Sequence, residues 1–206
     1  MNLSNLEFLQ NNSIFSTRDF AINSKISVSS ATRILNRMTK KNELKNLTRG
    51  FWVYDSKNEV HPFSLSPYLI GNANGYISLL SALHIHGVIS QIPTRIQIVS
   101  TNHQRILKTN FGIFEFFQMK PNMINDGINW SNTKLPYRIA SIEKAILDIF
   151  YLSTRKGKRF SFLPELELKE TNFKKKKFFS LLKKQNFSSS IHKAILIKAE
   201  KFLNTD

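Results

Sequence analysis

Two short amphipathic segments, separated by only a few residues, restrict the fold of this chain more than any other feature. Ser16 and Asp19 have the spacing of a capping box, which predicts that a short helix begins there. Asn23 tolerates the left-handed conformation and so favours a turn. Ser27 is placed to cap a second helix, over about 28–40. The predicted buried stripe of that helix is Val28, Ala31, Leu35 and Met38. Two helices joined by such a tight turn predict a helix-turn-helix.

The outer face of the second predicted helix carries residue types that contact DNA. Arginine pairs with guanine, asparagine pairs with adenine, and hydroxyl groups and lysine contact phosphates. The residues on this face are Ser29, Ser30, Thr32, Arg33, Asn36, Arg37 and Lys40. An ordinary surface helix with a basic outer face is the alternative interpretation. The tight spacing of the two helices favours a DNA-reading helix.

The segment after the second helix has the pattern of a β-hairpin. Residues 43–47 and 50–54 read as strands, and Thr48-Arg49-Gly50 fits the turn between them. A basic hairpin in this position is typical of the wing of a winged helix, with Arg49 at its tip close to a phosphate or a minor groove. For Trp52 and Tyr54, core packing is favoured over base stacking.

Charge separates the chain into three parts. The whole chain carries 30 Lys and Arg against 14 Asp and Glu, a net charge of +16, which predicts a polyanion partner. Residues 1–57 have nine Lys and Arg against four Asp and Glu (+5). Residues 58–150 have seven Lys and Arg against five Asp and Glu (+2). Residues 151–206 have fourteen against five (+9). A solvated surface in a lysine-rich proteome is the alternative explanation of this charge.

The remainder of the chain, 58–206, alternates short strand-like and helical patterns, which predicts a mixed α+β domain. Within this domain, residues 152–206 are predicted to form a helical C-terminal part. Expected strands are 95–99, 112–117 and 137–140, joined by a basic connection over 103–110. Expected helices are 76–86, 142–152 with Ser141 as cap, 171–185 and 188–203. The fold class is therefore α+β, an N-terminal winged helix-turn-helix followed by a mixed domain ending in helices.

A run of four lysines begins the third of these helices. Lys174, Lys175, Lys176 and Lys177 are interpreted either as a solvated face or as a contact with phosphate or an acidic partner.

The chain shows no pattern that predicts an enzyme, a metal site or a cofactor. It has no cysteine, which excludes thiolate ligands and agrees with a cytoplasmic location. His84 and His86 would point about 200° apart on a helix, so they cannot hold one metal together. Glu143 and Asp148 would point in roughly opposite directions, which is unsuited to paired acid–base chemistry. No apolar run approaches the roughly 20 residues of a membrane span.

Three stretches together resemble the AbiEi family, the antitoxins of the abortive-infection AbiE systems. They are the helix-turn-helix followed by Arg49-Gly50-Phe51-Trp52-Val53-Tyr54, the stretch from Gly75 to Gly87 (GYISLLSALHIHG), and the stretch from Ile139 to Asp148 (IASIEKAILD). They cover most of 1–152, and their order and spacing carry the resemblance. Residues 153–206 match nothing typical of the family.

The resemblance implies a bacterial transcriptional autorepressor and antitoxin of a type IV toxin–antitoxin system. Such a protein binds repeats of double-stranded DNA in its own promoter through the winged helix. It counters a nucleotidyltransferase-like toxin through its C-terminal domain, here residues 58–206, in systems that act against phage. The seven helix residues given above would face the operator, with Arg49 at the wing tip. Two alternatives stay open. One is a winged-helix regulator or basic interaction protein without a toxin partner, binding nucleic acid, RNA included, or an acidic protein. The other is a nuclease or nucleotidyltransferase using Glu143 or Asp148.

Overall fold

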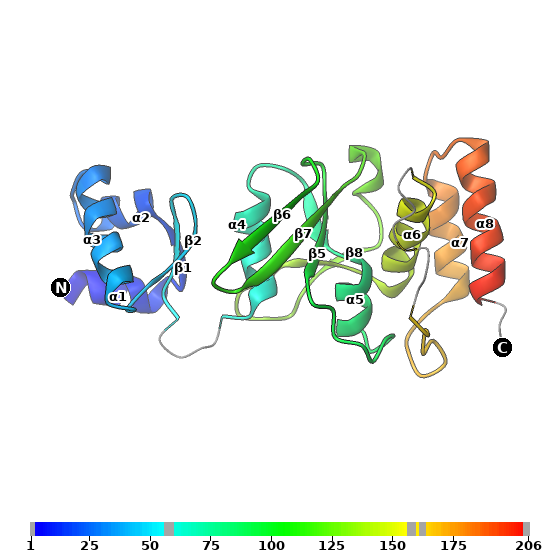
Figure 1. The fold of residues 1–206 in the computed structure, drawn as a ribbon, viewed down its shortest axis with the longest axis horizontal. Helices are drawn as coiled ribbons and strands as arrows, with labels where there is room; N and C mark the ends of the chain where they lie inside the picture. Colours follow the sequence, from blue (N-terminus) through cyan, green and yellow to red (C-terminus); the bar gives the residue numbers. More distant parts are fainter. Residues whose placement is uncertain (1–2, 56–59, 156–159, 161–163, 204–206) are drawn as a thin grey trace. The chain divides into compact units, whose positions relative to one another are not determined.

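The computed structural model describes residues 3–55, 60–155, 160 and 164–203. Within them the chain forms two compact units (Figure 1). Unit 1 comprises residues 1–69 and 108–112, and unit 2 comprises residues 70–107 and 113–206. The predicted boundary after residue 57 lies outside the described residues. Helices and two sheets are both present, which confirms the α+β class.

In its described residues, unit 1 combines four α-helices with a small antiparallel sheet. The elements are α1 (Leu3–Asn11), β1 (Ile14–Ser16), α2 (Thr17–Asn23), α3 (Val28–Lys40), β2 (Lys45–Thr48), β3 (Phe51–Val53), the 3-10 turn η1 (Pro62–Leu65) and α4 (Ser66–Ile70). The strand order is β1-β3-β2, so the hairpin formed by β2 and β3 is extended by β1 from the beginning of the unit. Trp52 at the centre of β3 is paired with Phe15 on one side and Asn46 on the other.

The caps of α2 and α3 form as the sequence predicts. The Ser16 hydroxyl accepts from the Asp19 N–H at 3.1 Å, and the Asp19 carboxylate accepts from the Ser16 N–H at 2.9 Å, which completes a capping box. The Ser27 hydroxyl accepts from the N–H of Ser30 at 3.2 Å. The left-handed residue of the turn is Lys25, with φ of +53°, whereas Asn23 is the last residue of α2.

The core of unit 1 lies where the helices meet the sheet. Trp52 is 4 % exposed and its indole N–H donates to the Thr17 hydroxyl at 2.8 Å, so the prediction of core packing for Trp52 is confirmed. Tyr54 is partly buried and packs against the same core. Ala31, Leu35 and Met38 are buried as predicted, but the prediction for Val28 is wrong, because its side chain is 52 % exposed. Val28 is the first residue of α3, and the buried residues Ala31, Leu35 and Met38 all follow it along the helix.

Unit 2 is built on a six-stranded mixed sheet. Its elements are β4 (Gly75–Ile77), α5 (Leu79–Ile85), β5 (Ile96–Ser100), β6 (Arg105–Thr109), β7 (Gly112–Gln118), the 3-10 turn η2 (Pro121–Met123), β8 (Ile128–Trp130), β9 (Arg138–Ala140), α6 (Ile142–Ser153), α7 (Lys175–Lys184) and α8 (Ser189–Leu203). The strand order is β6-β7-β5-β4-β9-β8. β4 lies in the middle, antiparallel to β5 and parallel to β9.

The structure corrects three predicted elements of unit 2. The predicted helix over 76–86 begins only at Leu79, because Tyr76 and Ile77 pair within the sheet as β4. A short apolar run can belong to a buried strand or a buried helix, and periodicity does not separate the two. The expected connection over 103–110 contains β6, and β8 has no counterpart among the predicted strands.

Helix α6 is the centre of unit 2, packed against α5, α7 and α8 (Figure 1). All its residues from Ile142 to Leu152 are buried. The Ser141 hydroxyl accepts from the N–H of Lys144, which confirms the predicted cap. The helix predicted over 171–185 begins at Lys175, since Lys174 has extended backbone angles. No helix in the described ranges combines the length and the apolarity that crossing a bilayer requires.

Candidate nucleic-acid interface

The structure places all seven predicted helix residues on α3, but it gives them two different environments. Ser29, Arg33, Asn36, Arg37 and Lys40 are exposed. Ser30 and Thr32 are half-buried. The Ser30 hydroxyl accepts from the Ser27 hydroxyl at 3.0 Å, and the Thr32 hydroxyl donates to the Val28 carbonyl at 2.8 Å. The Ser29 hydroxyl likewise lies 3.0 Å from the Ser27 hydroxyl. Among the described residues, the exposed side chains of this set without such a bond are therefore Arg33, Asn36, Arg37 and Lys40.

The electrostatics of α3 are uniformly positive. The helix contains Arg33, Arg37 and Lys40 and no acidic residue. Within the described part of the chain, none of these three cations forms an ion pair with a carboxylate. Their charge is therefore available to an external anion.

Arg49 occupies the two-residue turn that joins β2 to β3. Its neighbour Gly50 has φ of +80°, a conformation that glycine adopts without steric cost. The N–H of Thr17 donates to the Gly50 carbonyl at 2.9 Å, which fixes the base of this turn to the start of α2. Arg49 is exposed at the tip, where the sequence predicts it.

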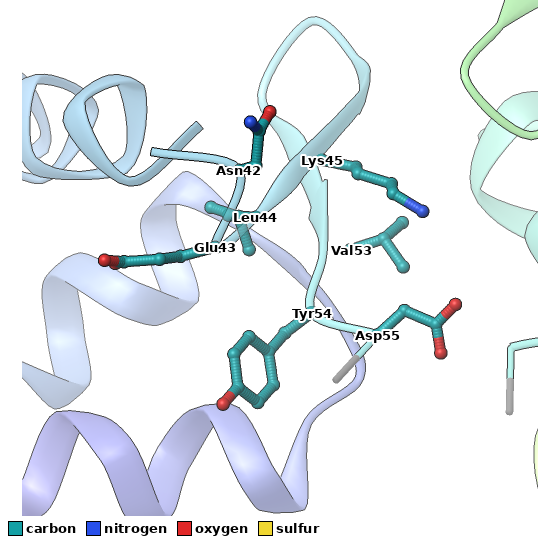
Figure 2. Close-up of a pocket in the computed structure, with 7 residues that line it drawn as sticks. All are labelled: Asn42, Glu43, Leu44, Lys45, Val53, Tyr54 and Asp55. Atoms are coloured by element: carbon teal, nitrogen blue, oxygen red, sulfur yellow. The ribbon is translucent and has the colours of Figure 1, made fainter. Parts of the chain in front are cut away.

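A pocket in unit 1 lies beside the hairpin and does not share the character of α3. Figure 2 shows its lining residues, which are Asn42, Glu43, Leu44, Lys45, Val53, Tyr54 and Asp55. Two carboxylates oppose a single ammonium group, so the lining is unsuited to a phosphate. We assign this pocket no role in nucleic-acid contact.

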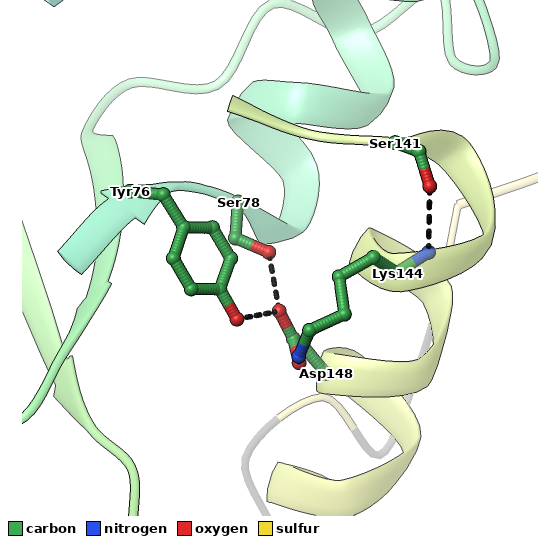
Figure 3. Close-up of polar contacts among 5 residues, drawn as sticks. All are labelled: Tyr76, Ser78, Ser141, Lys144 and Asp148. Atoms are coloured by element: carbon green, nitrogen blue, oxygen red, sulfur yellow. Dashed lines mark hydrogen bonds and ion pairs between the residues drawn. The ribbon is translucent and has the colours of Figure 1, made fainter. Parts of the chain in front are cut away.

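Unit 2 contains a buried polar cluster that sequence reasoning missed (Figure 3). Asp148 on α6 accepts at one carboxylate oxygen from the Tyr76 hydroxyl and the Ser78 hydroxyl, each at 2.8 Å. Its other oxygen pairs with the ammonium of Lys144, one helical turn earlier. The side chains of Lys144 and Asp148 are both fully buried. The available signal was a Lys–Asp pair four residues apart on a helix whose other residues, apart from Glu143 and Ser153, are apolar or aromatic.

The backbone around this cluster is adapted to it. Ser78 is at the N-cap position of α5, yet its hydroxyl bonds to Asp148 instead of capping the helix. The N–H of Leu80 is satisfied by the side chain of Gln97 at 2.9 Å. Leu79 has φ of +57°, a conformation that costs a residue with a side chain of its size on the order of 1–3 kcal/mol. Burial, and then the charge of Asp148 and the hydrogen bond to it, raise the pKa of Tyr76 well above its ordinary value.

Glu143 does not belong to this cluster and instead anchors α7. Its carboxylate accepts from the backbone N–H of Lys174 and pairs with the ammonium of Lys177, both at 3.0 Å. Glu143 and Asp148 thus have separate partners, as expected from their directions on the helix. All four lysines of the run are exposed, although Lys177 pairs with Glu143. Both interpretations of the four-lysine run, a solvated face or a contact with phosphate or an acidic partner, stay predictions.

The environment of Glu143 predicts an acid-dependent loss of stability. Burial by itself would raise the pKa of Glu143, but hydrogen bonds from backbone N–H groups and from the side chains of Lys177 and Ser141 outweigh it and lower the pKa. A lowered folded-state pKa contributes stability that is complete above the ordinary value of 4.5 and is lost as pH falls through the folded value. Glu143→Gln should therefore weaken the dependence of stability on pH below about 4.5, as measured by urea unfolding.

A matched variant separates this effect from general loss of charge. Lys184→Gln removes the partner of Asp126, an ion pair of 3.4 Å with both side chains substantially exposed. Such a pair contributes about 0–1 kcal/mol, so this variant should keep the pH profile of the wild type. Identical profiles for Glu143→Gln and wild type would show that Glu143 does not anchor α7.

The two histidines considered as metal ligands have different surroundings. His84 lies in α5, and His86 follows the helix with its Nε2 2.7 Å from the carbonyl oxygen of Ala140. Among the described residues, no group of three or more His, Asp and Glu side chains is arranged to hold a metal ion.

Comparison with known proteins yields no assignment. No protein-family model matches the chain, and the search of curated proteins finds no significant match.

Proposed function

We propose that this protein is a sequence-specific DNA-binding transcriptional autorepressor whose first unit is a winged helix-turn-helix. In this proposal α2 and α3 are the helix-turn-helix, α3 reads the major groove, and the β2–β3 hairpin is the wing. The observation that supports it most is the outer face of α3. It exposes Ser29, Arg33, Asn36, Arg37 and Lys40, contains no acid, and lies opposite a stripe that is buried against the rest of unit 1.

The local geometry also supports this role. The turn between α2 and α3 contains only Ser24 to Ser27, and the Ile26 N–H donates to the Ala21 carbonyl at 3.1 Å, which ties the turn to α2. Arg49 projects from the hairpin that follows, where a wing contacts a phosphate or the minor groove. Contacts of Arg49 with the phosphate backbone of DNA would fix the position of the protein on the duplex, while α3 supplies the base contacts.

We further propose that unit 2 acts as the antitoxin against a nucleotidyltransferase-like toxin, in the cytoplasm. This part rests on the resemblance of Gly75–Gly87 and Ile139–Asp148 to the AbiEi family. These stretches supply the four members of the buried cluster, so the resemblance coincides with the centre of unit 2. Co-expression with a nucleotidyltransferase-like protein encoded beside this gene tests it: the chain should relieve growth arrest, and continued arrest would refute the antitoxin role alone.

The alternatives receive less support. A nuclease or nucleotidyltransferase using Glu143 or Asp148 would need these carboxylates to reach a substrate, but both are buried and bonded to other residues. An RNA or an acidic protein bound by the four-lysine run would compete with Glu143 for Lys177.

Selection from a random duplex library tests the DNA-binding proposal directly. The full chain should enrich a defined sequence, and a labelled copy of that duplex should bind at least about tenfold more tightly than a scrambled duplex at the same salt concentration. Fluorescence anisotropy measures both affinities. Equal affinity for selected and scrambled duplexes would refute sequence-specific binding, whatever the total affinity for nucleic acid.

A further inference from the structure

An apolar side chain stands exposed at the N-terminal end of α3. Val28 is the first residue of the helix and is 52 % exposed, whereas Leu35, seven residues later, is fully buried. The two lie about 20° apart around the helix axis, so their difference comes from position along the axis. Helical side chains lean toward the N-terminus, and the side chain of Val28 therefore extends past the turn of α3 that packs in the core.

The residues that follow Val28 on the same edge of α3 are Thr32 and Asn36. The Thr32 hydroxyl donates to the Val28 carbonyl at 2.8 Å, so its only proton is used inside the helix. The Ser29 hydroxyl lies 3.0 Å from that of Ser27. The first two turns of α3 therefore combine the isopropyl group of Val28 with hydroxyls that already have partners, followed by the exposed amide of Asn36.

Val28 and Asn36 are eight residues apart, about 12 Å along the helix axis, so they would contact different base pairs. In the major groove, thymine differs from the other bases by its 5-methyl group, which is read by apolar contact, and adenine is read by asparagine. The N-terminal residues of a reading helix contact base edges. We propose that Val28 is a specificity-determining residue that packs against a thymine 5-methyl group in the major groove. The inference rests on the proposed DNA-binding function and specifies which bases that same surface prefers.

A second apolar side chain near this position defines the competing explanation. Ile22, the penultimate residue of α2, is 70 % exposed. If the exposed carbon surface were a contact between copies of this chain, Ile22 and Val28 would both contribute to it. A base contact requires Val28 alone, since Ile22 is not on the reading helix. Ile22→Ala therefore serves as the matched control for Val28→Ala.

The experiment replaces thymine with deoxyuridine, one position at a time, in the duplex selected by the full chain. This change removes the 5-methyl group and keeps the base pair. At one or two positions we expect the wild-type affinity to fall about fourfold, the effect of losing one buried methyl group. Val28→Ala should bind the thymine duplex about three to ten times more weakly than wild type. The loss of affinity on replacing thymine with deoxyuridine, the deoxyuridine penalty, should be much smaller for this variant than for wild type. Val28→Thr, which replaces one of the two methyl groups with a hydroxyl and keeps the other, should bind with an affinity between those of wild type and Val28→Ala. Ile22→Ala should bind like wild type.

Other outcomes overturn the inference. A selected duplex that tolerates every deoxyuridine with less than about twofold change would refute it while sequence-specific binding stands. An unchanged deoxyuridine penalty in Val28→Ala would show that another side chain reads the methyl group. A shift of oligomeric state in sedimentation for both Ile22→Ala and Val28→Ala, without a deoxyuridine effect, would identify a protein contact instead. If no sequence is enriched, the proposed function fails, and this inference fails with it.

Discussion

Asp148→Asn is expected to lower the free energy of unfolding by about 3–5 kcal/mol, because it leaves the buried ammonium of Lys144 without its counter-charge. The variant keeps the size of the side chain and one oxygen that can accept from Tyr76 and Ser78, the partners of the carboxylate at 2.8 Å. The loss is therefore assigned to charge and not to a cavity. Urea unfolding followed by circular dichroism measures it, with an unchanged denaturant slope as the check on two-state behaviour.

The double variant Lys144→Met/Asp148→Asn tests this assignment. Removing both charges leaves no uncompensated ion, and methionine has a length similar to that of the lysine stem. The double variant should recover most of the stability lost in Asp148→Asn, by about 2–3 kcal/mol. If Asp148→Asn were as stable as wild type, the cluster would not hold α6 against β4.

Local signals in the sequence predicted local structure correctly. The caps at Ser16, Ser27 and Ser141 could all be predicted from the sequence, because a capping hydroxyl bonds to an N–H only two or three positions away. The outer face of α3 could also be predicted, because helical periodicity alone places Arg33, Arg37 and the other polar residues on one side.

Features that depend on distant residues could not be read in this way. Tyr76 and Ile77 form a strand because β5 and β9 lie on either side of them, and nothing within the run itself favours a strand over a helix. The exposure of Val28, the first residue of α3, depends on which other elements pack at that end of the helix. The buried cluster joins residues 70 and 72 positions apart, Ser78 and Tyr76 with Asp148, so it exists only in the folded unit.

The two units differ in whether their charged side chains are paired within the protein. In unit 2, polar side chains in the centre are paired with one another: Asp148 with Lys144, and Glu143 with Lys177. On α3, the three cations have no carboxylate partner among the described residues. Paired charges stabilise the fold when their geometry is good, whereas unpaired exposed cations contribute little to it. The cations of α3 are therefore better explained by a partner than by folding.

Arg33→Ala and Arg37→Ala test this explanation and carry the largest expected effect on DNA binding. Each variant should weaken binding of the selected duplex by about 1–3 kcal/mol if its guanidinium reads a base. A phosphate contact would instead lower the slope of log K against log salt by about one unit. A salt titration by fluorescence anisotropy distinguishes the two, and the loss for a base contact should be smaller on a scrambled duplex.

Arg95→Ala is the matched control, because it removes the same side chain and charge from unit 2. Arg95 lies 3.4 Å from the carboxylate of Glu115, so its charge is already partnered within the protein. This variant should bind the selected duplex with nearly the affinity and the salt slope of wild type. If Arg33→Ala and Arg37→Ala both match wild type throughout the titration, α3 does not read DNA, and the exposed cations on its outer face form only a solvated surface.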